Sequence, residues 1–133
     1  MQAPESFIQT VATELDGLVS AARPNLEASG VDIQTDSPSG RDYTIWTGRF
    51  TKCRPGPTGF EQTTVIFLNC MLPLHPTQVK DLEVDFHAIA EIFQIGKSSR
   101  VRSDSKGKLI LGQLLSSGIE RMILEKIEGG VIC

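Results

Sequence analysis

Between positions 62 and 72 the chain is apolar at both alternate sets of positions. β-branched and aromatic residues are frequent there, and Gly59 and Pro73 bracket the segment. Side chains of a strand alternate between two faces, so this pattern predicts a central strand that is covered on both faces. One set of apolar positions is Val65, Phe67 and Met71, and the other is Ile66, Leu68, Cys70 and Leu72.

The N-terminal segment has the periodicity of an amphipathic helix. Ser6, followed three residues later by Gln9, is typical of a capping box at a helix start. Pro24 is expected to end or bend this helix, because proline lacks an amide hydrogen and its ring clashes with the preceding turn. A further turn to Ser29 is expected, with Gly30 as the terminator. The positions at helical spacing are Phe7, Val11, Leu15, Leu18 and Ala22.

Two strands are predicted between this helix and the central strand. Residues 31–34 form a short apolar-polar segment, and the turn residues of 36–40 follow it. Residues 42–54 form a longer segment rich in β-branched and aromatic residues. The kinked loop 54–59 then leads into the central strand, which predicts an antiparallel meander of these three strands.

The C-terminal half is predicted to be helical. Pro76 is expected to open a second helix that Gly96 closes, since apolar residues recur there at intervals of three and four. A last helix is expected from about Lys108 to Glu128, although Gly112 and Gly118 weaken it. The alternative is a hairpin across 101–111, followed by a short helix after Ser116. The apolar seam of the second helix is Val79, Leu82, Phe86, Ile89 and Phe93.

These elements predict a single α+β domain over residues 1–133. Its antiparallel sheet has three or more strands and is flanked by an N-terminal helix and two C-terminal helices. The length is sufficient for a hydrophobic core, and 40% hydrophobic and 22% charged residues are ordinary values for a globular domain.

Basic residues gather in two stretches of an otherwise acidic chain. The net charge is −3, so any attraction to an anionic partner must come from a local patch. We predict such a patch if the two stretches meet at one edge of the sheet, and RNA or a phospholipid surface is the expected partner class. Tyr43 and Trp46, on the same strand as the first stretch, are candidates for stacking on bases. The predicted patch comprises Arg49, Lys52, Arg54, Lys97, Arg100, Arg102, Lys106 and Lys108.

The alternative to a binding patch is that the 97–108 loop carries charge only because an exposed loop must stay solvated. A protein-binding adaptor or chaperone is then the favoured function, because the last predicted helix is apolar over a broad arc. The same apolar surplus predicts self-association, for which a homodimer is the commonest solution.

Enzymatic chemistry has little support in the sequence. Glu83, His87 and Glu91 would share a helix face, so a small metal-dependent enzyme is a third hypothesis. No nucleophile elbow is present, and the three cysteines have no metal-binding spacing. We therefore expect a non-enzymatic protein with no catalytic residues, no bound metal and no cofactor.

The termini and hydropathy predict a cytoplasmic protein. The first residues lack the basic and apolar regions of a secretory signal, and no apolar run reaches the roughly 18 residues that span a bilayer. The expected partners are thus a second copy of the chain, RNA or an anionic lipid surface, or another protein.

Overall fold

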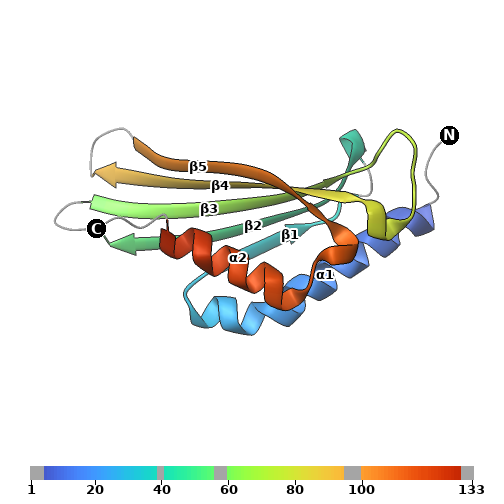
Figure 1. Cartoon of the computed structure of the whole chain (residues 1–133). Helices are drawn as coiled ribbons and strands as arrows, with labels where there is room; N and C mark the ends of the chain where they lie inside the picture. The colour runs from blue at the N-terminus through green and yellow to red at the C-terminus, as the bar shows by residue number, and fades with distance from the viewer. Residues whose placement is uncertain (1–4, 39–40, 56–59, 95–99, 130–133) are drawn as a thin grey trace.

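A computed structural model describes residues 5–38, 41–55, 60–94 and 100–129 of the chain. The regular elements follow one another as a long helix, a run of strands and a shorter helix (Figure 1). The elements are α1 (Glu5–Ala28), β1 (Asp32–Asp36), η1 (Arg41–Tyr43), β2 (Thr44–Pro55), β3 (Phe60–Met71), η2 (Val79–Asp81), β4 (Glu83–Gln94), β5 (Arg100–Ile110), η3 (Leu111–Gln113) and α2 (Ser116–Gly129).

Within the described residues, the strands form a five-stranded antiparallel sheet in the order β1-β2-β3-β4-β5. Each strand pairs with its neighbour in sequence, and β3 lies in the middle. Both α-helices pack on the same face of this sheet (Figure 1). The α+β class, the antiparallel meander, the N-terminal helix and a C-terminal helix are therefore confirmed. The predicted number of helices is wrong, because one C-terminal helix is present in the described residues instead of two.

Helix α1 forms where its periodicity predicts it. Val11, Leu15 and Val19 are buried against the sheet, and the helix continues through Pro24 to Ala28. Gly30 caps the end of the helix, and its φ of 83° suits a residue without a side chain. The amide of Gly30 donates to the carbonyl of Glu27 at 2.9 Å, and the amide of the next residue donates to Leu26 at 3.0 Å, which completes a Schellman cap.

The predicted second helix is wrong: residues 83–94 are strand β4, which pairs with β3 and β5. Val84, Ala88 and Ala90 are buried, whereas Asp85 and His87 lie on the other face. This alternation has period two. The helical interpretation failed because apolar residues of both strand faces, such as Phe86 and Ile89, happen to be three residues apart.

The predicted helix from Lys108 is also wrong in its first part. Residues 100–110 form strand β5 at the edge of the sheet, and α2 begins only at Ser116. The alternative interpretation is correct about the start of the helix, but the predicted hairpin across 101–111 is wrong: residues 100–110 form a single strand that pairs with β4, and Leu111 begins η3. In the β4–β5 pairing Ala90 faces Ser103 and Glu91 faces Val101, so Arg102 is an extra residue on β5.

The central strand β3 has one covered and one uncovered face. Ile66, Leu68 and Cys70 are buried under the helices, whereas Phe67 and Met71 on the other face are 39% and 38% exposed. The prediction that both faces are covered is therefore wrong for the described part of the chain. The segment that was expected to supply the second covering helix has instead joined the sheet as β4. We call the face that no described helix covers the open face.

Candidate binding face

The strand register places side chains of the open face in rows that cross the sheet. One row contains Arg49, Phe67, His87 and Lys106, which come from β2, β3, β4 and β5 respectively. The next row contains Thr47, Asn69, Asp85 and Lys108. Residues opposite one another on neighbouring strands have Cβ atoms roughly 5 Å apart, so neighbouring side chains within each row are close enough to interact or to contact one ligand together.

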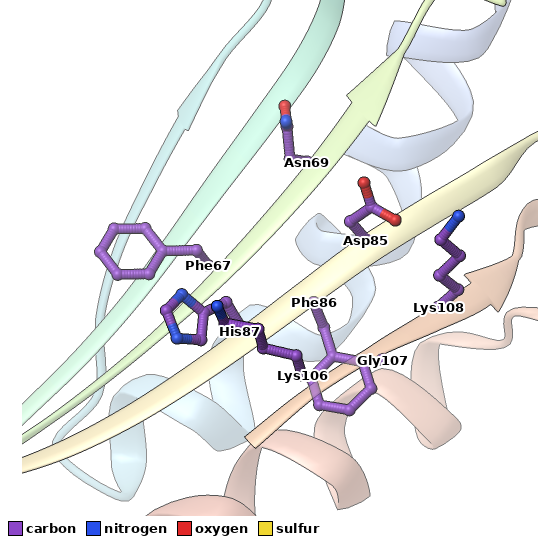
Figure 2. Close-up of a pocket in the computed structure, with 8 residues that line it drawn as sticks. All are labelled: Phe67, Asn69, Asp85, Phe86, His87, Lys106, Gly107 and Lys108. Atoms are coloured by element: carbon purple, nitrogen blue, oxygen red, sulfur yellow. The ribbon is translucent and has the colours of Figure 1, made fainter. Parts of the chain in front are cut away.

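Phe67 divides the open face into two hollows that together reach from β1 to β5. Phe67 and Asn69 line both of them. The first, which we call the β3–β5 hollow, has a volume of about 580 Å³, and Figure 2 shows the residues that line it. The second, the β1–β3 hollow, has a volume of about 600 Å³ and is bordered by Asp36 and Arg49.

Several polar groups of the open face are already engaged. His87 Nε2 and Asp104 Oδ1 are 2.5 Å apart. Lys108 Nζ donates to Glu83 Oε2 at 3.1 Å. This hydrogen bond, followed by the negative charges of Glu83 and Asp85, raises the pKa of the Lys108 ammonium above its ordinary value.

Other polar groups of the open face have spare bonding capacity. Asn69 Oδ1 is covered from solvent and has no hydrogen-bond partner in the described part of the chain. Among the described residues the Asn69 Nδ2 group donates only to the sulfur of Met71, at 3.2 Å, and a thioether is a weak acceptor. The Asp85 carboxylate has neither a hydrogen bond nor an ion pair among residues 5–38, 41–55, 60–94 and 100–129.

The structure brings together only part of the predicted basic patch. Arg49, Lys106 and Lys108 share the open face. Lys52 lies on the helix side, where its ammonium donates to the carbonyl of Ser29 at the end of α1. Arg54 is half-buried near the end of β2, on the same alternate set of positions as Lys52.

The remaining three members of the predicted patch are described less fully. Arg100 and Arg102 belong to β5 by their backbone, but their side chains lie outside the described atoms. Lys97 lies outside the described residues altogether. The part of the patch that can be placed is therefore limited to β2 and β5.

Carboxylates outnumber cations on the described open face. Arg49, Lys106 and Lys108 share this face with acidic side chains from four of the described strands, β1, β3, β4 and β5. A dense positive surface, which the sequence predicts, is not formed by the side chains that the structure describes. The acidic residues at outward positions are Asp32, Asp36, Glu61, Glu83, Asp85, Glu91 and Asp104.

The two predicted stacking residues have different environments. Tyr43 is 63% exposed in η1, just before β2, where it and Asp42 have positive φ angles of 64° and 55°. Trp46 is 0% exposed, and its indole Nε1 donates to Asp16 Oδ1 of α1 at 2.7 Å. Trp46 therefore joins the first helix to the sheet, and its ring is inaccessible to a partner in the folded chain.

The metal-site hypothesis loses its geometry once residues 83–94 are a strand. Glu83, His87 and Glu91 still share a face, but four residues along a strand span roughly 13 Å, about twice the spacing in a helix. In the portion of the chain that the structure describes, no group of three or more His, Cys, Asp or Glu residues could hold a metal ion.

The cysteine thiols also differ in accessibility. Cys70 is buried on the helix side of β3, and burial, with a smaller contribution from the charge of Asp85, raises the pKa of its thiol to about 11. Cys53 is exposed on β2. A thiol with such a high pKa is a poor nucleophile at neutral pH.

Phe67, Asn69 and Asp85 were not singled out in the sequence. The available signal was the alternation of 83–91, in which Glu83, Asp85, His87 and Glu91 occupy one set of positions. Read as a strand, this segment predicts a polar outer face and therefore an uncovered row of β3 side chains beside it.

No family model, curated protein or solved structure matches this chain. No helix of the described residues is long and apolar enough to cross a membrane.

Proposed function

We propose that this chain is a non-enzymatic binding protein and that the open face of its sheet binds a protein partner. The observation that carries the proposal is the exposure of Phe67 at the centre of that face. An antiparallel sheet with a solvated face normally presents polar side chains there, so an exposed aromatic ring beside the half-buried Val65 and Ile89 is unusual. Protein interfaces typically have such a pattern, with an aromatic anchor at the centre and a polar rim.

The mixture of charges favours a protein over a polyanion as the partner. Acidic side chains surround the described cations, and phosphate groups would be repelled by them. A protein surface carries both signs of charge and can complement such a face. The alternative hypothesis of a protein-binding adaptor is therefore supported more strongly than the first hypothesis, and the binding surface moves from the helices to the sheet.

Photo-crosslinking tests the proposal directly. A photoreactive phenylalanine analogue at position 67 is expected to form adducts with a protein in the native host, identified by mass spectrometry. The same analogue at Leu115, which is 66% exposed just before α2, is the matched control. Equal adducts at both positions, or none above background at position 67, would refute a protein-binding role of the open face.

A nucleic acid or anionic lipid remains a second candidate because of one row of side chains. Arg49 and Lys106 flank Phe67 and His87, and neither cation has an ion pair in the described part of the chain. A base stacked on Phe67 would place its phosphates near these cations. Salt-sensitive binding of single-stranded RNA or of phosphatidylserine vesicles, abolished by Lys106→Glu and retained in Arg121→Glu, would support this candidate instead.

Self-association also remains a prediction. Pairing two open faces would oppose acidic side chains to one another, so this face gives a homodimer little electrostatic support. Light scattering at micromolar concentration measures the particle mass directly, and a mass of one chain per particle would refute the predicted homodimer.

A further inference from the structure

The β3–β5 hollow combines an exposed aromatic ring with hydrogen-bond acceptors on neighbouring strands. Phe67 forms one wall, and the ring of His87 lies beside it with the two centroids 6.3 Å apart and the planes tilted by 36° (Figure 2). Asn69 and Asp85 lie opposite one another on β3 and β4, one row further along. The hollow thus offers an aromatic surface next to an amide and a carboxylate.

The two acceptors that line the hollow have no protein donor in the described part of the chain. Asp85 has no hydrogen bond or ion pair among the described residues, and Lys108 beside it is held by Glu83. The amide of Asn69 bonds only a sulfur, so it loses little when it rotates and turns its oxygen toward a ligand. A buried acceptor without a partner is rare in folded proteins, which points to a group that is supplied from outside.

A guanidinium group meets these requirements better than other side chains. Its planar fork of N–H groups can donate to two acceptors that lie on adjacent strands, and its flat face can stack on an aromatic ring. Lys106 and Lys108 also line the hollow, but Lys108 is paired with Glu83, and a carboxylate or phosphate placed between Asn69 and Asp85 would be repelled by the adjacent Asp85 carboxylate. A neutral amide would leave the charge of Asp85 without a counterion.

We therefore infer that the β3–β5 hollow binds an arginine side chain of the protein partner, with its guanidinium between Asn69 and Asp85. This inference rests on the proposed function and names the chemistry of the partner at that face. The partner surface carries a basic residue, and Asp85 is the residue that selects it.

The experiment uses the full chain labelled with ¹⁵N and titrated with N-acetyl-arginine amide. Saturable shifts are expected for the backbone amides of Phe67, Asn69, Asp85 and His87, which line the hollow. N-acetyl-citrulline amide has nearly the same shape without the positive charge, so it is expected to give much smaller shifts. Equal shifts with both compounds, or shifts that map to another surface, would overturn the inference.

Matched variants test the role of the carboxylate. Asp85→Asn keeps the shape and removes the charge, so arginine binding is expected to weaken about three- to fivefold, as for a partly exposed ion pair. Asp81→Asn makes the same charge change in η2, outside the hollow, and is expected to leave binding unchanged. Lys106→Gln removes a competing cation from the hollow and is expected to tighten binding. Unchanged affinity in Asp85→Asn contradicts the inference.

The outcome separates this inference from the proposed function. If crosslinks to a protein form at position 67 but arginine amide does not bind in the hollow, the protein-binding role stands and the arginine assignment is wrong. If arginine amide binds and no crosslink forms at position 67, the hollow is a ligand site and the proposed protein-binding function is wrong.

Discussion

The hydrogen bond between Trp46 and Asp16 gives a quantitative test of how α1 is attached to the sheet. Trp46 is fully buried, and its indole N–H donates to the exposed Asp16 carboxylate at 2.7 Å. Asp16→Ala removes the acceptor and leaves the donor at the edge of the core. A hydrogen bond to a charged group contributes about 1.5–3 kcal/mol, and access of water to this site lowers the expected loss of unfolding free energy to about 1–2 kcal/mol.

Urea denaturation followed by tryptophan fluorescence measures this loss. Trp46 is the sole tryptophan in the sequence, so the signal reports its own environment. With a slope of about 2 kcal/mol/M, the transition midpoint of Asp16→Ala is expected to fall by roughly 0.5–1 M. Asp16→Asn retains an acceptor oxygen and is expected to lose less.

Glu14→Ala is the matched control, because Glu14 is exposed on the same helix and has no hydrogen bond or ion pair in the described part of the chain. Its unfolding free energy is expected to change by less than about 0.5 kcal/mol. Equal midpoints for Asp16→Ala and Glu14→Ala would show that the indole N–H needs no protein acceptor, and the proposed attachment of α1 would be refuted.

Three further predictions concern β3 and β5. Burial raises the pKa of Cys70 to about 11, so its thiol is expected to resist alkylation at pH 8 while Cys53 reacts. The measurement uses a variant in which the C-terminal cysteine is replaced by serine, and rapid labelling of both remaining cysteines in the folded chain would contradict the prediction. Because the folded pKa is raised from 9.0, the associated stability is present below pH 9 and is lost as the pH approaches 11. In Gly107→Ala the new Cβ would lie 2.3 Å from a phenyl ring carbon on β4, so calorimetry is expected to show a loss of about 1–3 kcal/mol. Gly118→Ala has free space in α2 and is expected to be neutral or stabilising, and equal effects of both substitutions would contradict the packing argument. Asn69→Val removes the unpaired oxygen and is expected to raise the unfolding free energy by about 1 kcal/mol while it weakens arginine binding; a loss of stability would contradict the assignment.

The parts of the fold that were predictable are those with one dominant periodicity. Val11, Leu15 and Val19 repeat at helical spacing without competition, and residues 62–72 combine apolar β-branched and aromatic residues between Gly59 and Pro73. Residues 83–94 were not predictable in the same way. Phe86 on the helix side and Ile89 on the open face are three residues apart, so together they imitate the spacing of an amphipathic helix. Pairing with β3 and β5 decides this segment, and such long-range pairing is not visible in a local pattern.

The candidate site shows the same limit. Composition identified the basic stretches correctly as clusters in the sequence, but Arg49 and Lys52 lie on opposite faces of β2. Which of them meets Lys106 depends on the register across four strands, and a shift of one residue would exchange their faces. Phe67, which dominates the open face, is indistinguishable in the sequence from the buried apolar residues on either side of it.

The edge strand β5 has a consequence for solubility. One side of its backbone pairs with β4, and along the described chain no strand pairs with the other side. An edge of this kind can recruit further chains into an extended sheet, but Asp104, Lys106 and Lys108 project from it and the extra residue at Arg102 interrupts its regular pleat. Charge and irregularity are expected to oppose such recruitment, and apolar substitutions at Asp104 and Lys106 are expected to increase aggregation through this edge.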